Sequence, residues 1–185
     1  MEENGVAAID ALERLKQGNK AYINAVRGVG DVSLERRLYT CRHGQKPYAV
    51  IVSCSDSRVV PEFIFSAGIG DLFVIRVAGN VIDNGQLGSI EYATEHLGCK
   101  LVVVLGHTGC GAVCAAAEQQ SGYVKFLTDE IKRAVGDEAD AVKASVLNVK
   151  QGVSKIKSLL NVSEVVVTGA LYHTDSGVVD FDQIS

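Results

Sequence analysis

The sequence predicts an α/β fold, with a mostly parallel central sheet of about four strands, a small edge strand and flanking helices. Two observations predict it. Short apolar runs recur along the chain without polar alternation, as in strands buried on both faces, and segments with helical spacing of apolar residues separate these runs. The runs cover residues 49–53, 71–77, 101–105 and 165–170. At 185 residues, we expect a single domain spanning residues 1–185.

The first predicted element is an amphipathic helix over residues 6 to about 27. Its apolar positions recur at helical spacing, with charged residues between them, and include Val6, Ile9, Leu12 and Leu15. Because no strand precedes this helix, its apolar stripe has no evident seat on its own sheet. We expect the helix to extend from the domain and to find an apolar surface there or on a second subunit.

The remaining elements follow from local signals. A short helix is expected from residue 33, and Pro61 occupies a tolerated first-turn position of the next helix. A helix over residues 86–97 should stop at Gly98. Further along, we expect a helix over residues 109–119, mostly helical structure over residues 123–160 with an interruption near Gly136, and an edge strand over residues 178–181.

Composition excludes several functional classes. The formal net charge of -4 and the 22% charged content describe an ordinary soluble protein without the basic excess that recruits nucleic acid or anionic lipid. No apolar segment approaches the roughly 20 residues that span a bilayer, and the acidic N-terminus is unlike a signal peptide. We therefore expect a cytoplasmic protein without nucleic-acid or membrane partners. The five cysteines lack a disulfide-scaffold spacing, which favours reduced thiols or metal ligands.

Two cysteines and one histidine stand where apolar runs end. Cys54 follows residues 49–53, while His107 and Cys110 follow residues 101–105. Since the carboxyl ends of parallel strands converge at one edge of a sheet, these side chains can meet. Two thiolates and an imidazole suit Zn²⁺, and three protein ligands leave a fourth position open, as in catalytic zinc sites. The alternative for Cys54 is a buried thiol that packs as a small hydrophobic side chain.

The motif Cys54-Ser-Asp56-Ser-Arg58, followed later by His107-Thr-Gly-Cys110, resembles the β-class carbonic anhydrases, and residues 53–58, 73–80, 89–97 and 106–113 resemble family blocks in the same order. The resemblance implies reversible hydration of carbon dioxide to bicarbonate and a proton. It implies that Cys54, His107 and Cys110 hold zinc, and that Asp56 and Arg58 form a catalytic pair beside the metal.

The same resemblance implies a homodimer or a dimer of dimers, with the N-terminal helix packed on the partner subunit. Gln45 matches a residue that offers its side-chain amide to the substrate, and Phe73 and Tyr92 match apolar and aromatic pocket residues contributed across the dimer interface. The alternative for Phe73 and Tyr92 is an ordinary place in the core.

Three alternatives to this function remain open at this point. The same ligands could serve a hydrolase of carbonyl sulfide or carbon disulfide, or a non-catalytic module that zinc stabilises. Asp56 and Arg58 could also be an ion pair that only stabilises a turn. Arg58 argues against the non-catalytic module, because a structural zinc site has no use for a cation that restrains a carboxylate.

Overall fold

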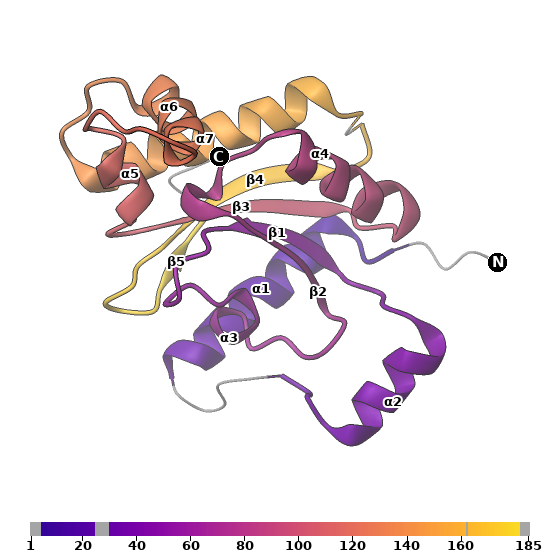
Figure 1. Cartoon of the computed structure of the whole chain (residues 1–185). Helices are drawn as coiled ribbons and strands as arrows, with labels where there is room; N and C mark the ends of the chain where they lie inside the picture. Colours follow the sequence, from indigo (N-terminus) through magenta and orange to yellow (C-terminus); the bar gives the residue numbers. More distant parts are fainter. Residues whose placement is uncertain (1–4, 25–29, 162, 182–185) are drawn as a thin grey trace.

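A computed structural model describes residues 5–24, 30–161 and 163–181 of the chain. Its centre is a five-stranded sheet in the order β2-β1-β3-β4-β5 (Figure 1). The strands are β1 (Ala49–Ser53), β2 (Leu72–Arg76), β3 (Leu101–His107), β4 (Val166–Tyr172) and β5 (Val179–Asp180). Neighbours among the first four run parallel, and the short edge strand β5 is antiparallel to β4. The predicted fold class is confirmed, including the small edge strand.

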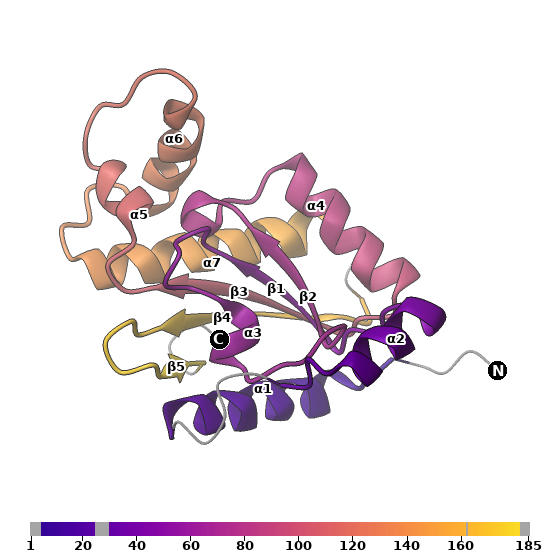
Figure 2. The same ribbon diagram turned by 60° about the horizontal axis from the view of Figure 1, so that its bottom comes forward.

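Helices cover both faces of this sheet, as Figure 2 shows. On one face, α4 (Asn84–Glu91) and α7 (Ala141–Leu159) pack on the side chains of Val50, Val52, Val102 and Val104. On the other, α1 (Ala8–Ile23) and α3 (Pro61–Ile64) pack on those of Ala49, Ile51, Val103 and Leu105. Successive side chains of a strand point to opposite faces, so β1 and β3 had to be apolar at every core position.

The apolar side of the N-terminal helix α1 packs on its own sheet. The expectation that the sheet offers this helix no packing surface is therefore wrong. Ala11 and Leu15 are fully buried in the core on that face. The polar Asn19 is also buried, and it ties α1 to the backbone of Ile64, Gly177 and Val179. The pattern of apolar residues did not predict that Asn19 faces the core. Its hydrogen bonds to these backbone groups hold it there. The predicted helix end near residue 27 lies outside the described residues.

Several helix boundaries differ from the sequence expectation. The segment predicted as one helix over residues 86–97 is α4 followed by a π-helical turn, η2 (Tyr92–His96). The glycine-rich segment forms only α5 (Gly111–Ala115), and residues 123–160 form α6 (Val124–Val135) and α7. Gly136 has a positive φ of 57° and ends α6, while the Asp140 carboxylate caps α7.

Helix α2 (Leu34–His43) is longer than predicted and buries none of its own residues. It stands beside the sheet rather than on it (Figures 1 and 2). Ser33 caps its start, and Arg36 holds it to the Asp71 carboxylate and the Ile69 carbonyl. Leu34, Leu38 and Tyr39 therefore remain largely exposed in the single chain.

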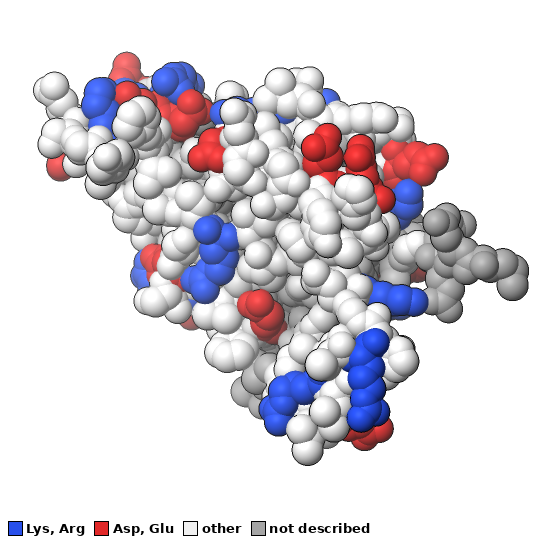
Figure 3. All heavy atoms as spheres, turned by 45° about the vertical axis from the view of Figure 1, so that its right-hand side comes forward, with Lys and Arg blue, Asp and Glu red and all other residues white. Residues whose placement is uncertain are grey.

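The surface carries small groups of either charge. On the face drawn in Figure 3, lysine and arginine side chains lie in separate small groups among acidic and uncharged ones and do not merge into one basic surface. Within the described part of the chain, no helix combines the length and the apolar character needed to cross a membrane.

Candidate metal centre

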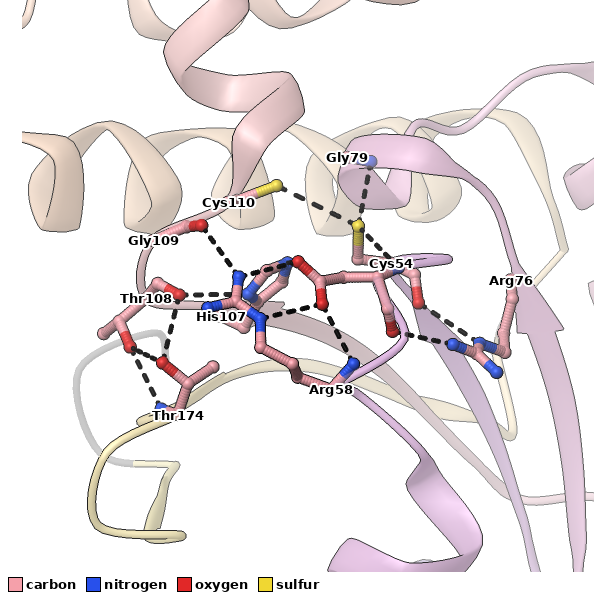
Figure 4. Close-up of polar contacts among 10 residues, drawn as sticks. Cys54, Arg58, Arg76, Gly79, His107, Thr108, Gly109, Cys110 and Thr174 are labelled. Atoms are coloured by element: carbon pink, nitrogen blue, oxygen red, sulfur yellow. Dashed lines mark hydrogen bonds and ion pairs between the residues drawn. The ribbon is translucent and has the colours of Figure 1, made fainter.

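The ends of two neighbouring parallel strands bring the three predicted ligands together. In the register of β1 and β3, Ser53 pairs with Leu105. Cys54 directly follows β1, His107 is the last residue of β3, and Cys110 immediately precedes α5. Their potential ligand atoms all lie within 4.8 Å of one another, and all three residues are buried. Figure 4 shows the two sulfur atoms and the imidazole converging from these separate segments.

The histidine has one ring nitrogen engaged and one free. Its Nδ1 lies 3.0 Å from the Thr108 carbonyl oxygen and donates to it, since a carbonyl can only accept. Its Nε2 is buried and has no hydrogen-bond partner among the described residues. Buried polar groups rarely stay unsatisfied, so this nitrogen, with its lone pair free, is a typical metal ligand fixed by a hydrogen bond at the other nitrogen.

Of the two cysteines, Cys54 is the one poised as a thiolate. Their sulfurs are 4.0 Å apart, and the Cys110 thiol is the main cause that lowers the pKa of Cys54 to about 4. The backbone N–H groups of Asp56 and Gly79 also donate to the Cys54 sulfur, at 3.4 and 3.3 Å. The hydrogen bond with Cys54 raises the pKa of Cys110, burial raises it further, and its ionisation would place a second buried thiolate beside the first. A bound cation removes that penalty, so the donor set fits zinc.

Beside this cluster, Arg58 forms a bidentate ion pair with Asp56. The guanidinium Nε and Nη2 donate to the two carboxylate oxygens at 3.0 and 2.8 Å, and the Arg58 backbone N–H donates to Oδ1. These bonds hold the pKa of Asp56 well below its usual range. Arg58 also donates to the Gly109 carbonyl at 3.1 Å, which anchors it to the loop between His107 and Cys110 (Figure 4).

The carboxylate lies next to the cluster without joining it. Asp56 Oδ2 is 3.9 Å from the free His107 Nε2, longer than a hydrogen bond. Its side chain is 19% exposed, so it faces both the cluster and solvent. The arrangement therefore places an ionised acceptor where a molecule bound near the ligands would meet it.

Sequence reasoning missed two supports of the site. Arg76 ends β2 and donates to the carbonyl oxygens of Cys54 and Asp56, at 3.3 and 2.8 Å. Thr174 shares a hydroxyl contact of 3.1 Å with Thr108 and also donates its backbone N–H to that hydroxyl. An arginine at the end of an apolar run was a visible signal for the first. The Thr108–Thr174 contact depends on the turn after β4, so no local pattern could have indicated it.

The three predicted pocket residues lie apart from this cluster. Phe73 and Tyr92 contact each other, with ring centroids 6.2 Å apart, whereas Gln45 is exposed in the segment after α2. Phe73 pairs in register with Val50, four residues before Cys54, or about 13 Å along a strand. Within the described residues, none of the three has a hydrogen bond or ring contact with the metal-ligand cluster. Their place in a substrate pocket therefore stays a prediction, and it would require a second subunit.

Comparison with known proteins matches the part of the chain that contains the metal-ligand cluster. The sequence model of the family described as carbonic anhydrase matches residues 49–179. A carbonic anhydrase of Mycolicibacterium smegmatis is 35% identical over 190 residues, covering 93% of this chain and 92% of that protein.

Solved structures agree with the fold. The β-carbonic anhydrase CafA of Aspergillus fumigatus superposes with a TM-score of 0.68 at 28% identity, covering 80% of this chain and 82% of that one. A tetrameric β-carbonic anhydrase of Sordaria macrospora gives a TM-score of 0.71 at 22% identity, covering 96% of each chain. The matched sequence segment contains all three candidate ligands and the Asp56–Arg58 pair, and the chain therefore belongs to the β-class carbonic anhydrases, a family of enzymes that are zinc lyases.

Proposed function

We propose that this protein is a zinc-dependent carbonic anhydrase that reversibly converts carbon dioxide and water into bicarbonate and a proton, with Cys54, His107 and Cys110 as the zinc ligands. The observation that carries the proposal is the unpartnered, buried His107 Nε2, which faces two cysteine sulfurs beside a carboxylate that an arginine restrains. A buried histidine that served packing alone would satisfy that nitrogen within the protein.

The chemistry divides between the metal and the Asp56–Arg58 pair. When bound, zinc supplies the Lewis acidity that makes water a nucleophile near neutral pH. Asp56 stays ionised and can only accept hydrogen bonds. It would accept a hydrogen bond from the O–H of the attacking water. This bond would turn a lone pair of the water oxygen toward the carbon of carbon dioxide. Arg58 fixes both carboxylate oxygens and keeps Asp56 from swinging onto the ligands.

A homodimer, or a dimer of dimers, belongs to the same proposal. In the single chain, β2 is an edge strand with a half-buried apolar surface, and α2 exposes Leu34, Leu38 and Tyr39. Unpaired edges and apolar surfaces of this kind favour association, and the similar Sordaria macrospora enzymes are described as tetrameric. A partner would bring Gln45, Phe73 and Tyr92 to the site. Sedimentation at micromolar concentration tests this, and a fully active monomer would refute it.

The domain extent, the outer packing of α1 and the location of the protein remain predictions. We expect residues 1–185 to fold as one unit, the exposed side of α1 to contact the partner, and the protein to reside in the cytoplasm. Limited proteolysis, cross-linking of the dimer and cell fractionation address these three points in turn.

The central experiment joins metal analysis with stopped-flow hydration of carbon dioxide. The wild-type protein should hold one zinc per subunit, and Cys54→Ala should lose most of its metal and its activity because water cannot replace a thiolate at equal strength. Cys99→Ala is the matched control, since Cys99 is equally buried but donates to the Pro47 carbonyl instead. Full zinc and full activity in Cys54→Ala would overturn the assignment.

The same wild-type sample distinguishes the substrate alternatives. Turnover of carbonyl sulfide or carbon disulfide above that of carbon dioxide would make the protein a hydrolase of those gases. Zinc without turnover of any of the three would identify a stabilising module. We expect carbon dioxide to be the preferred substrate, because the matching family model and the 35% identical relative are both described as carbonic anhydrases.

A further inference from the structure

We propose that Asn148, on helix α7, is a positioning residue for the metal centre, acting through the backbone of Gly79 on the Cys54 sulfur. The inference rests on the proposed zinc site and adds a residue outside the ligand loops. Asn148 does not contact the metal ligands itself. It hydrogen-bonds to the backbone of Gly79, which in turn contacts the Cys54 sulfur.

The connection consists of two buried hydrogen bonds in series. The Asn148 side-chain amide donates to the Gly79 carbonyl oxygen at 2.8 Å. The Gly79 backbone N–H donates to the Cys54 sulfur at 3.3 Å, as Figure 4 shows. The amide and the carbonyl of Gly79 lie on adjacent peptide units that share its Cα atom, so fixing the carbonyl restrains the direction of the N–H.

Gly79 needs such restraint because a glycine backbone does not hold one conformation by itself. It lies in the 3₁₀ turn η1 (Ala78–Asn80) with a positive φ of 66°, and glycine has the widest conformational freedom of any residue. A larger residue is unfavourable here, because the positive φ strains any side chain and an added Cβ would lie 2.6 Å from Ile131 Cδ1, which would have to move, and 3.1 Å from the Ala112 side chain. Glycine is therefore favoured at this position, and the bond from Asn148 supplies the restraint that glycine lacks.

The position of Asn148 supports a specific role. It is only 7% exposed, on a helix that also buries Ser145, Val149 and Val153. Burying an amide is unfavourable unless it is hydrogen-bonded, and its bond partner here is the carbonyl one peptide from the Cys54 contact. Groups that orient metal ligands typically contribute about 10–100-fold in metal affinity.

The test compares two variants with one matched control. Asn148→Leu keeps the approximate shape but removes the donor, and Asn148→Ala removes the whole amide. Ser145→Ala, on the same helix, truncates an equally buried polar side chain whose hydroxyl, among the described residues, donates to the Ala141 carbonyl of its own helix. Zinc affinity is measured by chelator competition, and the thiolate-to-metal absorption band is recorded after cobalt substitution. Hydrogen exchange of the Gly79 amide is followed in the metal-free protein.

We expect both Asn148 variants to bind zinc about tenfold or more weakly, to shift the cobalt–thiolate band and to exchange the Gly79 amide faster. Ser145→Ala should match the wild type in all three measurements. Wild-type affinity and an unshifted band in a folded Asn148→Leu protein would overturn this inference while leaving the zinc site intact. A wild-type protein that binds no zinc would instead overturn the proposed function and this inference with it.

Discussion

Replacing Asp56 by asparagine tests the core of the proposed chemistry with the smallest change of shape. Asp56 presents two acceptor oxygens to three donors of Arg58, its Nε, Nη2 and backbone N–H. In Asp56→Asn, Oδ1 can keep the contacts to Nε and the backbone, but the amide nitrogen takes the place of Oδ2. That nitrogen donates where the carboxylate accepted, so it opposes Nη2 and cannot accept a hydrogen bond from attacking water.

The size of the effect follows from the lost acceptor. Asp56 is 19% exposed, so solvent screens it only in part, and a hydrogen bond to a charged group contributes about 1.5–3 kcal/mol. Since about 1.4 kcal/mol corresponds to a factor of ten in rate, kcat for hydration should fall about 10–150-fold. Zinc content should not change, because Asp56 Oδ2 is not among the grouped ligand atoms.

Stopped-flow hydration with metal analysis of the same sample measures both quantities. Asp140→Asn is the matched control, since Asp140 accepts backbone N–H groups at the start of α7 and asparagine caps helices equally well. A zinc-loaded Asp56→Asn protein whose kcat stays within threefold of the wild type would refute the acceptor role and leave the pair as a turn-stabilising contact.

Three further predictions concern the site and the fold. Arg58→Ala should retain zinc but lose at least about tenfold in hydration rate because the carboxylate is no longer oriented; an unchanged rate across neutral and alkaline pH, by stopped flow, would contradict this. Asn19→Ala leaves two buried backbone groups and one half-buried backbone group without their partner. This loss costs about 3 kcal/mol and should lower Tm by about 10 °C; calorimetry showing a shift below 2 °C would refute that. Burial raises the pKa of Cys99 to about 11, so the folded state retains this proton more strongly than the unfolded state, and stability should fall as pH rises above about 9. Denaturation at several pH values should show a shallower fall of the unfolding free energy with pH in Cys99→Ala than in the wild type. Identical slopes in the two proteins would exclude Cys99 as a cause.

Local sequence was sufficient for the strands and for the ligands. Uninterrupted apolar runs can be buried on both faces only in a covered parallel sheet, and the structure has β1 and β3 as neighbours. Because carboxyl ends of parallel strands share one edge, the positions of Cys54 and His107 directly after or at the end of their strands already implied that they meet. Those conclusions needed only strand direction and adjacency.

The contacts between distant segments were decided by tertiary structure alone. Asn19 turns its amide into the core because the backbone near Ile64 and Val179 offers it partners, and no periodicity in α1 could reveal them. The same holds for Asn148, whose partner Gly79 lies 69 residues away. The amino-acid pattern by itself determined which residues are apolar, which can bind metal and where strands end. Which polar side chains are buried, and what they hold in place, depended on hydrogen bonds that exist only once the chain has folded, because a buried polar group is tolerated only where another segment supplies its partner.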